Sequence, residues 1–240
     1  MSTLLLRLAA PLQSWGADSK FEERRGTVRE PTKSGVIGML AAALGREREN
    51  PIDDLAELKF GVRVDQPGQL LKDFHTARIV GSKAPYVTKR HYLADAVFLV
   101  GLEGDDGQLF RLDEAIQAPV FPLFLGRRSC PPVGKISLGI SDKSLKDALH
   151  DCEWQACQSY KNRIKSLNEP LFLTVVIDSQ SVGNYRRCDV PLSFSQRHRK
   201  HQYRYLDDNP KGRLIWEKKE TEHDAMEAFG EVIQDVSVQD

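Results

Sequence analysis

Cysteine is scarce in this sequence. Four cysteines are scattered over 240 residues, at positions 130, 152, 157 and 188. Small disulfide-stabilised proteins carry more cysteines at closer spacings, so we expect these four to be reduced thiols. Cys152 and Cys157 have no second pair of cysteines or histidines nearby, which argues against a zinc site. The sequence therefore predicts no bound metal and no other cofactor.

Long apolar runs are also missing. The longest ones, such as residues 3–6 and 96–100, fall far short of the roughly 20 residues that a membrane-spanning helix needs. The first residues alternate like a strand and lack the basic, apolar and small-residue succession of a signal peptide. We therefore expect a cytoplasmic protein without a membrane segment. Its 40% of hydrophobic residues still allow a buried core in one or two compact units.

The motifs of familiar enzyme classes are absent as well. The sequence has no P-loop, no Gly-x-Gly-x-x-Gly after a predicted strand, no Gly-x-Ser-x-Gly and no paired metal-binding histidines. These absences argue against the enzymes that carry such motifs, whereas metal-independent RNA cleavage, which needs none of them, stays open; the resemblance described below is what implies a subunit without catalytic residues. A binding protein is the favoured class.

Acidic and basic residues are equal in number but unevenly distributed. The chain has 34 of each and a formal net charge of zero. Residues 217–240 hold eight acidic residues and two lysines, which leaves a formal charge of +6 in residues 1–216. Because salt confines the effect of each charge to about 8–10 Å, a local excess decides whether a surface attracts phosphate. A basic body with an acidic tail is thus compatible with a nucleic-acid partner.

The N-terminal residues predict a strand followed by a helix. Leucines alternate over residues 4–8 with a period of two, which indicates a strand with one face more buried than the other and with Pro11 as its end. Farther along, from Val36 to Leu44, apolar residues recur at helical spacing. This helix would be capped by Thr32 or Ser34 and stopped by Gly45.

Three further elements complete the predicted N-terminal unit. Residues 59–65 and 93–102 indicate strands, and residues 111–118 indicate a short helix. The order strand, helix, strand, strand, helix is typical of a ferredoxin-like or RRM-like unit of the α+β class. The polar stretch over residues 74–89 predicts a projecting hairpin or loop between the last two strands.

The second half predicts a smaller α/β part. Its expected elements are helices over residues 144–149 and 153–164 and extended segments over residues 171–178 and 185–194. The patterns divide the chain into a first domain, a smaller C-terminal part and an acidic tail, with boundaries at residues 1–140, 141–216 and 217–240.

The first basic stretch, residues 15–34, leads into the predicted helix. Its cations are Lys20, Arg24, Arg25, Arg29 and Lys33. Free N–H groups and a partial positive charge at a helix N-terminus attract phosphate, so an anion is expected against residues 32–35. Three glutamates partly offset the positive charge. An ordinary solvated loop before a capped helix is the alternative.

The second basic stretch, residues 74–94, contains no acidic residue at all. Four fixed cations, two histidines and two tyrosines lie within these 21 residues. Cations on phosphates and aromatic rings on bases are what hold single-stranded RNA. Binding to a phosphate backbone is about as well supported here as a plain surface hairpin.

The third basic stretch, residues 185–205, has one acidic residue, Asp189. Its basic residues are interleaved with aromatic ones, namely Arg186, Arg187, Arg197, Arg199, Lys200 and Arg204 with Tyr185, Phe194, Tyr203 and Tyr205. This interleaving favours nucleic acid, although a solvated basic face is the alternative. In a shorter element, residues 125–132, Gly126 would let the backbone approach a ligand closely, and two arginines are able to fork onto phosphate oxygens. A turn with two exposed arginines is the commoner explanation.

Several of these segments resemble the CasD subunit family of the type I-E CRISPR Cascade complex, within the RAMP superfamily. The matching strings, in order, are residues 6–16 (LRLAAPLQSWG), 31–40 (PTKSGVIGML), 92–96 (YLADA), 125–131 (LGRRSCP) and 189–194 (DVPLSF). The likeness extends over roughly residues 1–205, and the acidic tail lies outside it. The resemblance implies a ferredoxin-like, RRM-related RAMP fold with a projecting β-hairpin thumb at about residues 74–91 and a reduced C-terminal part.

The resemblance also implies a role. The subunit would cap the 5′ handle of the CRISPR guide RNA, contact the backbone subunit and the large target-recognition subunit, and meet target DNA only through the complex. Carried over position by position, RNA binding is expected at Gln13, Trp15, Arg25, Arg29, Thr32, Lys33, Ser34, Arg127, Arg128 and Ser129, and within the thumb at Arg78, Lys89 and Arg90.

Two other hypotheses remain open. Metal-independent RNA cleavage needs only a base, an acid and a cation, and the residues of the right type are His75, Tyr86, Lys89, His91 and Tyr92. A related subunit of type I-C systems cuts guide precursors with such residues, so an endoribonuclease is the first alternative. The second is a scaffold whose basic patches bind acidic protein partners.

Overall fold

The computed structural model describes residues 1–16, 24–78, 80–81, 85–167, 170–179 and 185–216. The predicted acidic tail lies outside these residues, as do Lys20 and Lys83. The strands are β1 (Ser2–Gln13), β2 (Arg24–Arg25), β3 (Lys59–Gln66), β4 (Gln69–Ala77), β5 (Tyr86–Gly104), β6 (Ser137–Ser141), β7 (Leu171–Asp178), β8 (Tyr185–Ser193) and β9 (Lys200–Trp216). The helices are α1 (Lys33–Ala43), α2 (Asp53–Ala56), α3 (Asp106–Gln117), α4 (Leu145–Asp151) and α5 (Gln158–Ser166).

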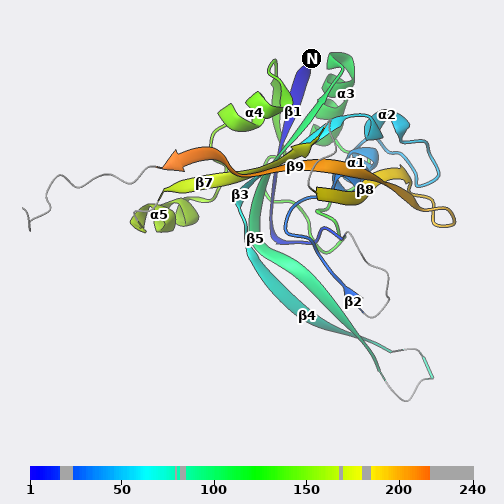
Figure 1. Ribbon diagram of the computed structural model, residues 1–240. Helices are drawn as coiled ribbons and strands as arrows, with labels where there is room; N and C mark the ends of the chain where they lie inside the picture. Colours follow the sequence, from blue (N-terminus) through cyan, green and yellow to red (C-terminus); the bar gives the residue numbers. More distant parts are fainter. Residues whose placement is uncertain (17–23, 79, 82–84, 168–169, 180–184, 217–240) are drawn as a thin grey trace, which may run out of the picture.

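The described residues form a mixed α/β structure with one large sheet (Figure 1). Its strands lie in the order β6-β1-β5-β3-β7-β9-β8, and β2 and β4 also pair with β5. Every pairing is antiparallel except the short parallel one between β2 and β5. Because β7, β8 and β9 extend the sheet that β3 begins, the predicted division at residue 140 crosses a continuous sheet. That division stays a prediction.

Strand β1 is buried on both faces, and the face of Leu4, Leu6 and Leu8 is the more buried one, as the sequence predicts. Leu4, Leu6 and Leu8 face a core that they share with α1 and α3, whereas Leu5 faces a second core with α4. The sheet is therefore covered by helices on both sides. Contrary to the expectation from the sequence, Pro11 does not end the strand, because β6 pairs only with residues 3–6 of β1 and leaves the edge beside Pro11 unpaired.

Helix α1 begins and ends where the sequence predicts. Thr32 is its N-cap, with Oγ1 accepting from the backbone N–H of Gly35 at 3.2 Å. Gly45 follows the helix with φ +74°, a left-handed conformation that favours glycine.

Two other helices differ from their predicted ranges. The helix expected over residues 111–118 begins earlier, at Asp106, with Asp105 as its cap, and that expected over residues 153–164 begins only at Gln158.

Strands β4 and β5 form a long hairpin that leaves the body of the protein (Figure 1). The two strands are in register from Gln69 opposite Ala94 to Ala77 opposite Tyr86. The hairpin starts where β5 passes beyond its partners β1 and β3. At this point Asp95 has φ +55°, and Gln66 Nε2 donates to the Asp95 carbonyl at 2.6 Å and to its carboxylate at 2.9 Å. Gln66 thereby stabilises the bend between body and hairpin.

A buried ion pair explains why residues 153–157 are not helical. The Arg63 guanidinium and the Asp65 carboxylate lie 2.6 Å apart, and both side chains are fully buried. Arg63 also donates to the carbonyls of Leu149, Cys152 and Glu153, and Asp65 accepts from the backbone N–H of Gln155. The backbone groups that would continue a helix are thus used to attach this segment to β3.

No helix among the described residues is long and apolar enough to cross a membrane.

Removal of Asp65 is expected to destabilise the fold strongly. The variant Asp65→Ala would leave the Arg63 charge buried without a counterion, which costs about 3–5 kcal/mol. Urea unfolding followed by circular dichroism measures the loss. Asp142→Ala, at an exposed position, is the control and should change the unfolding free energy by less than about 0.5 kcal/mol. Equal stability of the two variants would contradict the structural role of the pair.

Candidate nucleic-acid interface

Three segments that lie far apart in the sequence meet at the base of the hairpin. Strand β2 lies beside β5, with Arg24 opposite Lys89 and Arg25 opposite Arg90. The loop of residues 125–130 lies against the end of β1, where the Ser14 N–H donates to the Leu125 carbonyl at 3.2 Å. Ser14 Oγ in turn donates to the His91 carbonyl of β5 at 3.2 Å. Ser14 therefore links the loop to the hairpin.

Gly126 allows this close approach. Its φ is +84°, and a Cβ at this position would lie 1.7 Å from the Ser14 carbonyl oxygen. The sequence predicted that Gly126 brings the backbone close to a ligand. The group it approaches here is the protein's own backbone, because Ser14 occupies that space.

Arg127 connects the loop to both neighbouring segments. Its Nη2 donates to the Arg25 carbonyl at 2.9 Å, and its guanidinium lies 4.6 Å from the centre of the Tyr92 ring. Burial raises the pKa of the Tyr92 phenol, but hydrogen bonds with Arg127, Ser129 and Arg90 outweigh burial and hold this pKa below its ordinary value. The surrounding positive charge thus favours the phenolate form of Tyr92 relative to the phenol.

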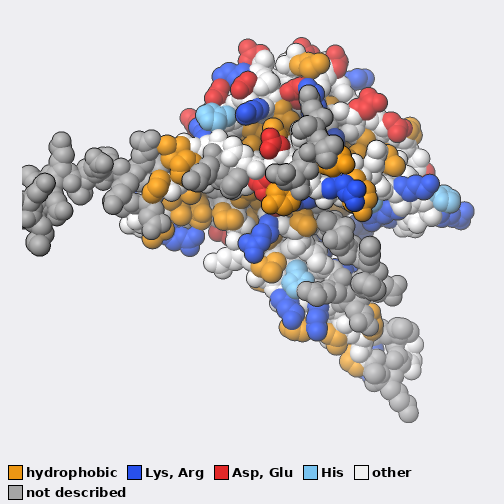
Figure 2. All heavy atoms as spheres, in the orientation of Figure 1, with side chains coloured by type: hydrophobic (Ala, Val, Ile, Leu, Met, Phe, Trp, Pro, Cys, Tyr) orange, Lys and Arg blue, Asp and Glu red, His pale blue; other side chains and the backbone are white. Residues whose placement is uncertain are grey.

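Five residues, which we call the hairpin-base cluster, present polar groups at this junction, namely Arg25, Arg90, Arg127, Arg128 and Ser129. Lys89 is exposed and alternates onto the other face of β5. Figure 2 shows Lys and Arg side chains gathered where the hairpin leaves the body. Arg90 Nε and Arg127 Nη1 are buried and have no hydrogen-bond acceptor within the part of the chain that the structure describes. Asp73 lies opposite Arg90 in register but does not accept a hydrogen bond from Arg90 Nε.

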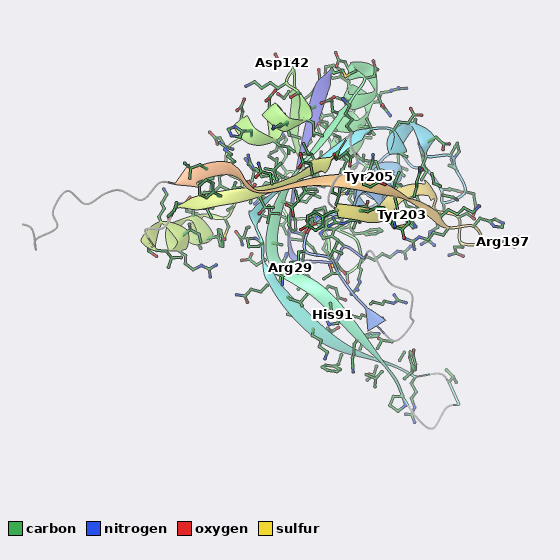
Figure 3. The ribbon with its side chains drawn as sticks, in the orientation of Figure 1. Arg29, His91, Asp142, Arg197, Tyr203 and Tyr205 are labelled. Atoms are coloured by element: carbon green, nitrogen blue, oxygen red, sulfur yellow. The ribbon has the colours of Figure 1, made fainter. Side chains whose placement is uncertain are left out.

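Arg29 and Arg78 are placed differently. Figure 3 shows Arg29 near the base of the hairpin, with His91 farther along β5. Arg29 is exposed and follows Val28, whose N–H donates to the Trp15 carbonyl at 2.8 Å. Arg78 follows the last residue of β4 near the tip of the hairpin, about 17 Å along the strand from the residue opposite Arg90. The structure therefore does not bring Arg78 into the hairpin-base cluster.

Gln13 and Trp15 are buried, although the sequence predicted that they bind RNA. Their exposed fractions are 0% and 1%. Gln13 Nε2 donates to the carbonyls of Leu8 and Ala96, and Gln13 Oε1 accepts from Trp15 Nε1 at 3.1 Å. Both side chains have their polar groups satisfied inside the protein. The Trp15 backbone pairs with Thr27 and Val28, which follow Arg25. Direct RNA contact by Gln13 and Trp15 stays an untested prediction.

The N-terminus of α1 already holds an anionic group of the protein. The backbone N–H of Lys33 donates to Asp189 Oδ2 at 2.9 Å, and Lys33 Nζ lies 3.3 Å from Asp178 Oδ2. Burial lowers the pKa of Lys33 below its ordinary value, and Asp178 opposes that shift. Thr32 and Ser34 are buried beside it. The Asp189 carboxylate thus lies where the sequence predicted phosphate, so RNA binding by Thr32, Lys33 and Ser34 is left without structural support.

Arg204 of the third basic stretch belongs to the same internal network. Its Nε lies 2.6 Å from Asp189 Oδ1 and its Nη2 lies 2.9 Å from Asp189 Oδ2, a forked ion pair, and Nη1 contacts Asp178. The sequence counted Arg204 as a surface cation and Asp189 as an isolated acid. No local pattern predicted their pairing, because it depends on the register between β8 and β9.

The residues of the endoribonuclease hypothesis do not share one face of the hairpin. His75 lies opposite Thr88, so it shares a face with Tyr86 and Tyr92, whereas Lys89 and His91 alternate onto the other face. Tyr86 and Tyr92 are also about 20 Å apart along the strand. Tyr92 is 5% exposed. The arrangement gives no support to a common catalytic site.

Comparison with known proteins assigns the family. The sequence model of the family described as CRISPR-associated protein (Cas_Cas5) matches residues 3–207. The chain belongs to this Cas5 family. It is 36% identical over 166 residues to the CRISPR system Cascade subunit CasD of Escherichia coli (strain K12), which covers 60% of this chain and 73% of the relative.

Solved structures agree with the Cas5 assignment. A chain of a CRISPR RNA-guided surveillance complex superimposes with a TM-score of 0.66 at 33% identity, covering 89% of this chain and 91% of the other. A crystal structure of a Cas protein gives a TM-score of 0.59 at 35% identity, covering 87% and 95%. The sequence-based resemblance to the CasD subunit family is thereby confirmed.

Gly126→Ala is expected to displace the 125–130 loop of this Cas5 chain. The new methyl group would overlap the Ser14 carbonyl in a left-handed conformation, so we expect a loss of at least about 2 kcal/mol in unfolding free energy. Chemical denaturation measures it. Gly26→Ala is the matched control, because no atom lies within 4 Å of its added Cβ. Similar stability of the two variants would contradict the close contact between Gly126 and Ser14.

Proposed function

We propose that this Cas5 chain is a non-catalytic RNA-binding subunit of a type I-E CRISPR Cascade complex that caps the 5′ handle of the guide RNA. The observation that supports this proposal most directly is the hairpin-base cluster, where Arg90 and Arg127 each keep a buried N–H without an acceptor among the described residues. Phosphate oxygens supply the acceptors that a guanidinium needs. The relative named as a Cascade subunit and the RNA-guided surveillance complex connect this chemistry with guide RNA.

The fold of the proposed subunit is a ferredoxin-like RAMP domain with a thumb. The succession β1-α1-β3-β5-α3-β6 and the spatial order β6-β1-β5-β3 support a ferredoxin-like unit. The β4–β5 hairpin is the proposed thumb, and residues 141–216 are the proposed reduced C-terminal part. In this arrangement the hairpin-base cluster lies between the domain and the thumb.

The proposed protein partners are the backbone subunit and the large target-recognition subunit, with target DNA reached through the complex. The hairpin supports a protein contact because it exposes apolar side chains, with Leu70 64%, Phe74 60% and Val87 45% exposed. Apolar groups gathered on a projecting element are typical of interaction surfaces. A cytoplasmic location stays a prediction of the same proposal.

Loss of exposed cations from the hairpin-base cluster should weaken RNA binding in a salt-dependent way. For the double variant Arg25→Ala/Arg128→Ala we expect weaker binding, and a slope of log K against log salt that falls by about 0.7 for each phosphate that is no longer neutralised. Anisotropy of a labelled single-stranded repeat RNA across a salt series measures both. Lys146→Ala, an exposed cation on α4, is the control. Unchanged RNA affinity with impaired assembly would support the scaffold hypothesis instead.

A non-catalytic role predicts that repeat RNA stays intact. Incubated with the full chain in EDTA, the RNA is expected to run at full length on a denaturing gel. The reason is that the candidate acid, base and cation lie on opposite faces of the hairpin. A single discrete product that disappears in His91→Ala would overturn the proposal in favour of the endoribonuclease.

A further inference from the structure

The outer face of β8 and β9 carries a group of aromatic and basic side chains that the hairpin-base cluster does not include. Tyr203 and Tyr205 are two residues apart on β9, so both rings lie on one face of the sheet. Arg186 of β8 is opposite Tyr205 in register and shares that face. The Arg186 guanidinium lies 4.3 Å from the centre of the Tyr203 ring.

The two faces of β9 differ sharply in burial. Tyr203 is 55% exposed and Tyr205 is 37% exposed, whereas Arg204 and Leu206 between and beside them are 8% and 3% exposed. Arg204 and Leu206 face the core, and the two rings face solvent. Figure 3 labels Tyr203 and Tyr205 along β9.

The charge around these rings has one sign over a long segment. Residues 190–206 contain no acidic residue, and the turn between β8 and β9 exposes Arg197, Arg199 and Lys200. Asp207, which is two residues beyond Tyr205 on the same exposed face of β9, is the acidic residue that ends the segment. Figure 2 shows Lys and Arg side chains at the turn between β8 and β9 and beside the apolar groups over these two strands. Such a surface attracts the phosphates of a nucleic acid.

The geometry points to a stacking platform for an unpaired base of single-stranded RNA, formed by Tyr203 with Arg186 and Tyr205. This inference rests on the proposed RNA-binding function and adds a second contact, made to a base rather than to the backbone. Arg186 orders the Tyr203 ring from one side, and the exposed part of the ring remains accessible to a base. Aromatic rings and arginine planes on a sheet face hold bases in this way without requiring a particular sequence.

A further ion pair connects this platform to the hairpin base. Arg187, next to Arg186, points to the other face of β8, where Nη2 contacts the Glu30 carboxylate. Glu30 follows Arg29, in the segment that joins β2, where Arg25 lies, to α1. The strand with the platform and the segment with the predicted phosphate-binding arginines are therefore held in a fixed relation. The platform lies on the opposite face of β8, which is the last strand in the sheet order, so it is a second basic surface on the same framework.

Substitution of Tyr203 tests the platform. With a labelled single-stranded repeat RNA and the full chain, Tyr203→Ala is expected to raise Kd by about tenfold, because loss of one base–aromatic stack typically has an effect of this order. Tyr203→Phe keeps the ring and is expected to bind within about twofold of the unchanged chain. Neither variant removes a charge, so the slope of log K against log salt should be unchanged. The matched control is Phe110→Ala on α3, where the aromatic side chain is 60% exposed.

The outcomes separate the platform from the proposed function. RNA with the fluorescent base 2-aminopurine is expected to lose emission when bound to the Tyr203 ring and to regain it in Tyr203→Ala. If Tyr203→Ala and Phe110→Ala bind RNA alike while Arg25→Ala/Arg128→Ala binds it weakly, the platform is wrong and the proposed function stands. If none of these variants binds less well, both are wrong. Loss of complex assembly alone in Tyr203→Ala would make this face a protein contact and also overturn the platform.

Discussion

The backbone hydrogen bonds of β5 hold together the features on which the proposed function depends. Over its second half the strand pairs with β1 and β3, and over its first half it pairs with β4 and, briefly, with β2. A buried strand must satisfy its N–H and C=O groups, so it cannot shift relative to one neighbour without breaking its bonds to another. The hairpin is consequently continuous with the core. Phe98 in the core and Lys89 at the hairpin base belong to one element, and Asp95 marks the bend between them.

Internal and external cations differ in how their charge is compensated. The buried cations Arg63, Arg204 and Lys33 each lie beside a carboxylate, and each of these pairs connects segments of the fold. At the hairpin base, Arg127 is held instead by backbone carbonyls and a tyrosine ring and has no carboxylate partner among the described residues. A buried charge needs a counterion, whereas a half-exposed one is able to remain unpaired until a ligand binds. This difference, rather than the zero net charge, separates the structural arginines from those that we propose to bind RNA.

The two surfaces proposed for RNA rely on different physical interactions. Cations at the hairpin base act on phosphates, which every nucleotide carries, so they hold a strand without distinguishing its sequence. A ring such as Tyr203 interacts only with a base that is unpaired and turned outward. Together they favour a single-stranded end over a duplex. That preference fits the family of the chain and the RNA-guided complex in which a similar structure occurs.

Local patterns in the sequence determined the element types, the capped helix α1 and the basic stretches, because spacing, caps and charge are properties of neighbouring residues. The predicted strand over residues 171–178 coincides with β7, and Thr32 is the N-cap of α1. The roles of individual polar residues were decided by the tertiary structure. Asp189 meets Lys33 and Arg204, and Gly126 meets Ser14, through strand register and long-range packing. The register between β8 and β9 and the packing of segments far apart in the chain have no local signal. Only the folded structure therefore separates Arg204, which is paired with Asp189 and Asp178, from Arg127, which has no carboxylate partner among the described residues.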